Sequence, residues 1–272
     1  MDYETLTERE WQRVDRIREL LDEASVESAR REIDSLLRGR PGHPDLRIVD
    51  AEVALAEEDP RAALEALEGA ERSADPVEFF NLRAQAAYGL CRFEQARADA
   101  ERAAAIDPDF AGIHDLLSRI HAHLRNAERA AEHAELAAEL DPEAFPPPLE
   151  MSDEEFDEVV RRSIEELPPE VRRILEEIPV LVDALPAPDL LTGADPPLSP
   201  DILGLFVGAS LLERSHADLP GVPPSIHVFR QNLLRDCADA DELAREIRTT
   251  VQHEVGHLMG GDEGRLEDWG IG

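Results

Sequence analysis

Two histidines near the end of the chain are four positions apart, and a glutamate follows the first of them. They are His253, Glu254 and His257 of the segment HEVGH. On a helix, residues four apart project from one face a turn apart, so both imidazoles can reach a single ion. Neutral imidazole suits zinc, and an adjacent carboxylate can act as a general base. The pattern predicts a zinc site at which Glu254 takes a proton from a metal-activated water.

A third ligand is expected just beyond the helix. Gly260-Gly261 is predicted to end the helix, because glycine is common just past a helix C-terminus. The longer pattern HExxHxxGxxE has the metzincin spacing and places Glu263 at the third-ligand position. Asp262 comes directly before it, and either carboxylate can bind, although the spacing favours Glu263. Two imidazoles and a carboxylate also suit iron, cobalt or manganese, so the assignment to zinc rests on the motif.

The motif needs a helix and a sheet to position it. A helix is predicted from Asp241 to about Met259, capped by Asp239. Strands are predicted over 179–185, 203–208 and 225–230, and helices over 152–166 and 168–177. We expect strand 225–230 to form the cleft edge that pairs with an extended peptide, with His227 or Arg230 as a candidate oxyanion stabiliser. An ordinary half-buried strand residue is the alternative interpretation of His227.

Residues 151–272 resemble the small bacterial zincin-like metallopeptidase family. The resemblance is carried by the segments MSDEEFDEVVRRSIEELPPEVRRILEEIPVLVDALP, ILGLFVGASLLERS, IHVFRQNLLRDC and LAREIRTTVQHEVGHLMGGDEGRLEDWGI. It implies a zincin-like fold, a bound zinc cofactor and hydrolysis of peptide bonds in a peptide or protein substrate. It also implies that His253 and His257 are ligands and that Glu254 is the catalytic base.

Three features depart from the family and from related enzymes. The family tends to have aspartate where this chain has Glu263. Metzincins carry a methionine turn after the third ligand, and no methionine follows here. Many such enzymes use a tyrosine at the oxyanion, whereas the tyrosines here are Tyr3 and Tyr88, far from the motif. Two alternatives therefore remain open: a catalytically inactive or structural zincin-like domain in an adaptor protein, and a hydrolase of non-peptide amides.

The first half of the chain contains an internal repeat. Asp107-Pro108 and Asp141-Pro142 lie 34 residues apart, and alanines recur with the same period. Residues 79–108 resemble a tetratricopeptide repeat, a pair of helices packed through small residues. Three repeats are predicted at 44–76, 77–108 and 110–142, each closed by an Asp-Pro pair, after a degenerate helical pair at 8–40. The five histidines of this region are interpreted as surface residues: His43, His114, His121, His123 and His133.

A proline cluster at 146–148 separates the halves. We expect a tetratricopeptide-like domain at 1–145 and a zincin-like domain at 146–272. The fold class is thus α+β overall: all-α helical repeats, then a small α+β domain. Such repeat arrays usually bind a protein partner, here the substrate or another protein.

Composition narrows the class of partner. The net charge is −33 and the chain contains no lysine, so it should repel nucleic acid and anionic membranes. No apolar run is long enough for a membrane span and no secretory signal is recognised, so a cytoplasmic location is expected.

Overall fold

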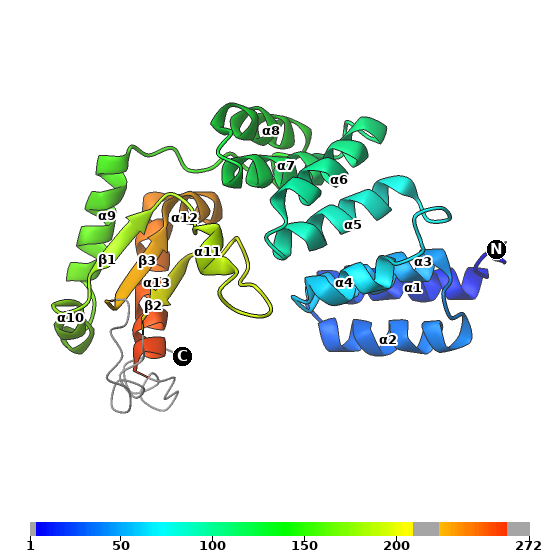
Figure 1. Ribbon diagram of the computed structural model, residues 1–272, viewed down its shortest axis with the longest axis horizontal. Helices are drawn as coiled ribbons and strands as arrows, with labels where there is room; N and C mark the ends of the chain where they lie inside the picture. Colours follow the sequence, from blue (N-terminus) through cyan, green and yellow to red (C-terminus); the bar gives the residue numbers. More distant parts are fainter. Residues whose placement is uncertain (1–3, 209–222, 260–272) are drawn as a thin grey trace. The chain divides into compact units, whose positions relative to one another are not determined.

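The computed structural model describes residues 4–208 and 223–259. The chain divides into two compact units (Figure 1). The first comprises Met1–Pro146 with Thr192–Ser199, and the second comprises Pro147–Leu191 with Pro200–Gly272. As predicted, helical repeats precede a small α+β domain. The segment Thr192–Ser199 is grouped with the repeats, where Asp195 pairs with Arg61 at 2.5 Å.

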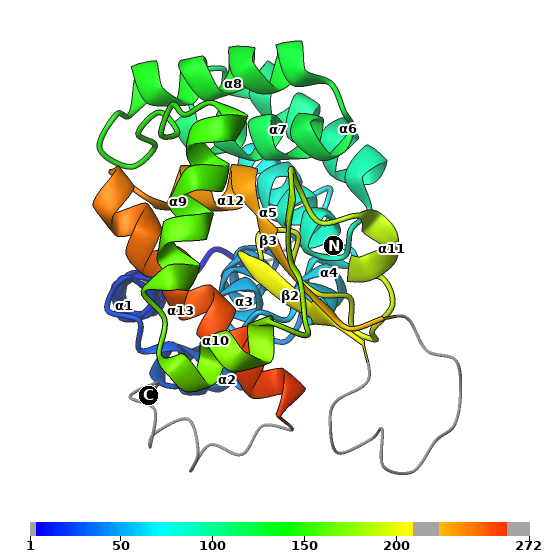
Figure 2. The same cartoon turned by 90° about the vertical axis from the view of Figure 1, so that its left-hand side faces the viewer.

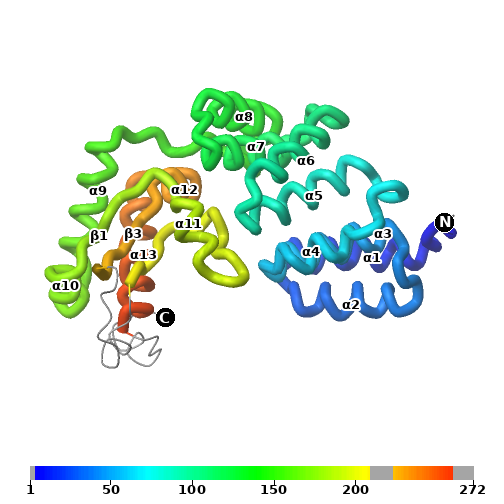
Figure 3. The backbone as a smooth tube through the Cα atoms, viewed as in Figure 1, coloured from blue at the N-terminus to red at the C-terminus, as the bar shows by residue number. Residues whose placement is uncertain are grey.

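The first unit is a series of helical hairpins, which Figure 3 traces as a continuous tube. Its helices are α1 (Glu8–Asp22), α2 (Val26–Gly39), α3 (Pro44–Ala56), α4 (Pro60–Leu67), α5 (Pro76–Gly89), α6 (Phe93–Ile106), α7 (Ala111–His123) and α8 (Ala127–Leu140). Alanines such as Ala63, Ala84 and Ala96 are fully buried and let paired helices approach closely.

The same tight turn joins the two helices of every hairpin. Ala24, Glu58, Cys91 and Arg125 occupy the turns with φ of 54°, 58°, 57° and 58°. The residue after each turn donates its backbone N–H to a carbonyl five residues earlier, as Asn126 does to His121 at 2.9 Å. Because α1 and α2 share this turn, the N-terminal pair predicted as degenerate is a regular fourth hairpin.

Two expectations about the repeats need correction. Asp107 and Asp141 cap the C-termini of α6 and α8 as predicted, but Asp75 caps the N-terminus of α5, where its carboxylate accepts from the N–H groups of Val77 and Glu78. Asp75-Pro76 therefore starts a helix and does not close one.

The second correction concerns the histidines, which were all expected at the surface. His43, His114 and His121 are only 4%, 6% and 6% exposed. Helix packing encloses them, and Nε2 of His43 lies 3.0 Å from the carbonyl oxygen of Glu4. Periodicity alone did not separate these buried positions from surface ones.

The second unit packs its longest helix against one face of a three-stranded sheet. The helices are α9 (Asp153–Glu165), α10 (Pro169–Leu175), α11 (Pro188–Leu191), α12 (Arg230–Asp236) and α13 (Ala240–Leu258); the strands are β1 (Val180–Asp183), β2 (Gly204–Val207) and β3 (Ser225–Phe229). The order is β1-β3-β2, with β1 parallel and β2 antiparallel to β3. The expectation that 225–230 forms the cleft edge is therefore wrong, since β3 is central. Helix α12 was not predicted.

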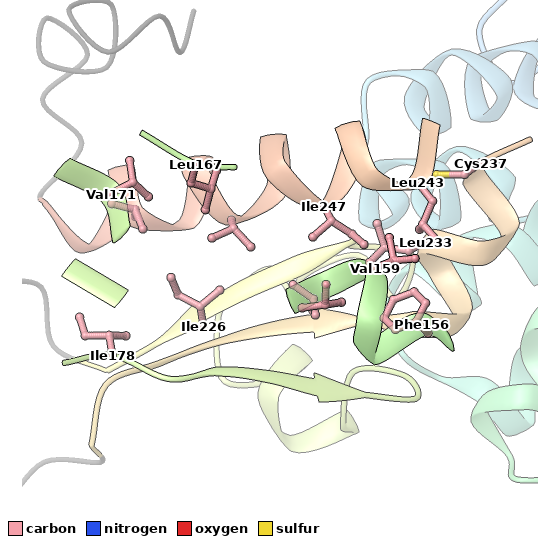
Figure 4. Packing of buried hydrophobic residues seen from close by; sticks show 14 of the residues in the cluster. Phe156, Val159, Leu167, Val171, Ile178, Ile226, Leu233, Cys237, Leu243 and Ile247 are labelled. Atoms are coloured by element: carbon pink, nitrogen blue, oxygen red, sulfur yellow. The ribbon is translucent and has the colours of Figure 1, made fainter. Parts of the chain in front are cut away.

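The core of this unit lies between α13 and the sheet, with α9 beside α13 (Figure 2). Ile226 and Val228 of β3 are fully buried there together with Ile247 and Val251 of α13. Figure 4 shows Phe156 of α9 and other apolar side chains of the same cluster filling this layer. In the described part of the chain, no helix is both long and apolar enough to cross a membrane.

Candidate metal centre

Helix α13 carries the HEVGH segment in its last turns. The carboxylate of Asp239 caps the helix by accepting from the N–H groups of Asp241 and Glu242, as the sequence predicts. The apolar face of the helix packs on the sheet, which fixes its rotation about its own axis. His253 and His257 are consequently exposed, while Glu254 on the inner side of the same turn is 7% exposed.

The two imidazoles converge on one point in space. Nε2 of His253 lies 3.0 Å from Nε2 of His257, and the two rings are nearly perpendicular at 87°. A carboxylate oxygen of Glu254 completes a group in which all three ligand atoms lie within 4.8 Å of one another. Zinc with nitrogen ligands at about 2.0–2.1 Å separates them by roughly 3.3 Å at the tetrahedral angle, so the donor pair fits this ion. Within residues 4–208 and 223–259, this is the one group of three or more such residues that could hold a metal.

Glu254 is held by the backbone of the edge strand. The N–H of Phe206 in β2 donates to Oε2 of Glu254 at 2.7 Å. Leu203 and Phe229 are a hydrogen-bonded pair, because the N–H of Phe229 donates to the carbonyl of Leu203. Hydrogen-bonded and non-hydrogen-bonded pairs alternate along antiparallel strands. Phe206 and Ile226 are therefore a pair with no hydrogen bond between their backbones. The N–H of Phe206 consequently points to the outer edge of β2. The edge strand thus fixes the carboxylate beside the two histidines.

A glycine allows α13 to lie this close to β2. A Cβ at residue 204 would come 2.4 Å from Cγ2 of Thr250 and 3.5 Å from Cγ of Glu254. Sequence reasoning missed both Gly204 and the N–H of Phe206. A glycine inside an apolar strand often marks a close approach of another element, which was the available signal for Gly204. A backbone donor leaves no signal in side-chain patterns.

The structure does not bring His227 to this group. Side chains alternate along a strand, and the neighbours of His227, Ile226 and Val228, face α13. The ring of His227 therefore lies on the opposite face of the sheet. There its Nδ1 is 2.6 Å from Oδ2 of Asp183 and its Nε2 is 3.0 Å from Oγ of Ser225. These bonds tie β3 to β1 and satisfy the buried Ser225 hydroxyl.

The expected third ligand lies outside the described residues. Glu263, and the alternative Asp262, follow the end of α13 at Leu258. Their roles as ligands stay predictions.

Comparisons with known proteins bear on the family that this part of the chain resembles. Residues 175–271 match the model of a family described as zincin-like metallopeptidase. No curated protein matches the sequence. A crystal structure of MamA matches with a TM-score of 0.39 and 17% identity, over 46% of this chain and 73% of that chain, which is too weak a similarity to inform function. Residues 175–271 therefore match a zincin-like metallopeptidase family, and an array of helical hairpins precedes them in the chain.

Proposed function

We propose that this protein is a zinc-dependent peptidase. The observation that carries the proposal is the 2.7 Å hydrogen bond from the Phe206 N–H to Glu254, which fixes a buried carboxylate beside the His253–His257 pair. A carboxylate that served only to solubilise the helix would face water. The family match over residues 175–271 supports the same chemistry.

Each residue of the site has a proposed role. His253 and His257 would hold zinc with Glu263, or Asp262, as the third ligand. When bound, zinc would supply a Lewis acid that polarises the scissile carbonyl. Glu254 accepts a proton from the attacking water and then delivers it to the leaving amine nitrogen. Because Oε2 is held by Phe206, Oε1 is the oxygen that carries this proton.

The outer edge of β2 is the surface proposed to hold the substrate. Gly204 and Phe206 direct their backbone groups away from β3, and among the described residues no strand lies beyond them. Since the Phe206 N–H is bonded to Glu254, an extended peptide would pair with the Phe206 carbonyl and the backbone groups of Gly204. A substrate segment without regular structure fits this mode of binding.

The helical repeats are proposed to recruit the substrate or another protein. Stacked helical hairpins offer an extended binding surface, and linking such a surface to a catalytic unit raises the local concentration of the bound protein. The net charge of −33 favours partners with basic surfaces.

A peptide library tests the proposal. The zinc-loaded full chain is incubated with a mixture of unstructured peptides, and products are identified by mass spectrometry. We expect defined cleavage that Glu254→Gln abolishes. Glu246→Gln, two turns earlier on α13, serves as the matched control and should cleave normally. No cleavage by the native chain, or equal cleavage by Glu254→Gln, would reject catalysis and favour an adaptor with an inactive zincin-like domain.

A further inference from the structure

Three polar side chains form a hydrogen-bonded series on the face of the sheet that is turned away from α13. Oγ of Ser225 lies 3.0 Å from Nε2 of His227, and Nδ1 of His227 lies 2.6 Å from Oδ2 of Asp183. Ser225 and His227 are two residues apart on β3, so their side chains share this face, and Asp183 reaches them from β1. A serine, a histidine and an aspartate are thus joined in sequence outside the HEVGH segment.

The carboxylate determines which nitrogen of the imidazole carries the proton. Ionised Asp183 can only accept a hydrogen bond, so Nδ1 of His227 carries the proton. In the neutral ring, Nε2 then has a lone pair, and the Ser225 hydroxyl donates its proton to it. This order of bonds activates a serine as a nucleophile, because the imidazole can take the hydroxyl proton and the carboxylate stabilises the imidazolium that results.

The exposure of the three residues suits this chemistry. Ser225 is 7% exposed, and the side chains of His227 and Asp183 are 15% and 45% exposed. Hydrogen bonds that are shielded from water are electrostatically stronger than exposed ones. The nucleophile is therefore shielded, while the base and the carboxylate reach solvent.

Leucines flank the imidazole on the same face of the sheet. Leu181 of β1 and Leu205 of β2 are the partners of His227 in the two strand pairings. Paired residues project to the same side of a sheet, so both leucines lie beside the His227 ring. Leu181 is 42% exposed, and its side chain offers an apolar surface next to the base. A substrate with an apolar acyl group fits this surface.

We propose that Ser225, His227 and Asp183 form a second hydrolytic site, which cleaves esters of short apolar acids. Ser225 is the nucleophile, and His227 is first the general base and then the general acid. Asp183 is a positioning residue, because it acts through His227. The site lies on the opposite face of the sheet from the HEVGH segment, and its chemistry needs no metal. Its activity is therefore independent of the zinc peptidase proposed above.

Two acyl transfers complete the reaction. Oγ of Ser225 bonds to the ester carbonyl carbon as its proton moves to Nε2 of His227. The bond to the alcohol oxygen then breaks, and Nε2 returns the proton to that oxygen, which gives an acyl-serine and a free alcohol. Water follows the same course: it loses a proton to Nε2 and attacks the acyl carbon, and the proton passes to Oγ as the free acid leaves.

An alkyl fluorophosphonate, from which an activated serine displaces fluoride at phosphorus, tests the nucleophile directly. The full chain carries His253→Ala and is kept in EDTA, so that zinc takes no part. We expect a covalent adduct on Ser225, located by mass spectrometry of proteolytic peptides. Ser152 is the internal control, because its exposed hydroxyl bonds to the carboxylate of Glu155 and not to an imidazole. No adduct on Ser225, or equal labelling of Ser152, would overturn the proposal, and neither outcome bears on zinc binding.

Hydrolysis of p-nitrophenyl hexanoate in the same background separates chemistry from packing. Ser225→Ala should abolish it, and His227→Gln should slow it about 10²–10⁴-fold, the usual contribution of a general base. Asp183→Asn should slow it and move the acid limb of the pH profile to lower pH, because the imidazolium loses its carboxylate. Leu181→Ser should slow cleavage of the hexanoate more than that of the acetate ester. Circular dichroism checks that each variant is folded. Native rates in Ser225→Ala, or an unmoved pH profile in Asp183→Asn, would overturn the site.

Discussion

Gly204 packs against Thr250, and this contact is possible only because glycine has no Cβ. A Cβ on residue 204 would lie 2.4 Å from Cγ2 of Thr250, closer than two carbon atoms can approach without displacement. This contact sets the separation between β2 and α13. The same separation allows the N–H of Phe206 to reach Glu254 at 2.7 Å.

Gly204→Ala should therefore destabilise the second unit and impair the candidate site. Overpacking of this kind typically costs about 1–3 kcal/mol. The measurements are the free energy of unfolding and the cleavage of a peptide substrate. Thr250→Ser removes Cγ2, so the double variant should recover part of both losses. If Gly204→Ala alone has the wild-type free energy of unfolding, the contact with Thr250 does not set the separation between β2 and α13.

The hydrogen bond from the backbone N–H of Phe206 to Glu254 can be removed by substituting Phe206 with proline. Phe206→Pro deletes the N–H at an outward-facing edge position, where proline is tolerated in a sheet. Phe206→Leu keeps the N–H and is the control for lost aromatic packing. Loss of a residue that orients an active-site group typically costs about 10–100-fold, so we expect Phe206→Pro to reduce peptide cleavage by that factor relative to Phe206→Leu. Equal activity in the two variants would mean that Glu254 does not depend on this donor.

The capping box of α1 should make the start of the repeats sensitive to acid. The backbone N–H of Thr7 is the main cause that lowers the pKa of Glu10 from 4.5 to about 2, followed by the Thr7 hydroxyl; Arg40 adds to the effect. Because the folded-state pKa is depressed, this stabilisation is present above pH 4.5 and is lost as the pH falls from 4.5 to about 2.

Amide hydrogen exchange across the first turn of α1 measures this loss. Glu10→Gln should make the first turn exchange faster at neutral pH and should remove its response to acid. Glu8→Gln deletes the same charge from the same turn without touching Thr7, and should retain the response. An acid response that survives in Glu10→Gln would assign it to another group.

The hairpin α5–α6 contains a partly buried ion pair that should be costly to break. Asp99 is 3% exposed and accepts two bonds from the guanidinium of Arg83, at 2.6 and 2.8 Å. Asp99→Ala would remove both bonds to Arg83, and a hydrogen bond to a charged group is typically worth about 1.5–3 kcal/mol. Denaturant unfolding should show this decrease, whereas Glu101→Ala on the exposed face of α6 should change stability little. Similar stability in the two variants would contradict the structural importance of the pair.

The local signals in the sequence predicted the elements that carry the site. Asp239 marked the start of α13, and the spacing of His253 and His257 placed both rings on one helical face. The 34-residue spacing of Asp107 and Asp141 predicted the helix ends in the repeats. These features depend on residues close together in the chain, so local reasoning reaches them.

The non-local features were not predicted. The order β1-β3-β2 depends on pairing between distant segments, so the edge was assigned to strand 225–230 when it belongs to β2. For the same reason His227 was expected near the site although its ring is on the other face of the sheet. The burial of His114 and His121 depends on α8 packing against α7, which no single-helix pattern reveals.

Metal content of the purified full chain tests the central claim most directly. Plasma mass spectrometry is applied to native protein beside His253→Ala and Glu263→Ala, with Asp262→Ala as the alternative third-ligand variant and His227→Ala as the control away from the site. The account predicts about one equivalent of zinc at this site, lost in His253→Ala and Glu263→Ala and kept in His227→Ala. Native protein that contains no zinc, and takes up none at this site on titration, would contradict the account.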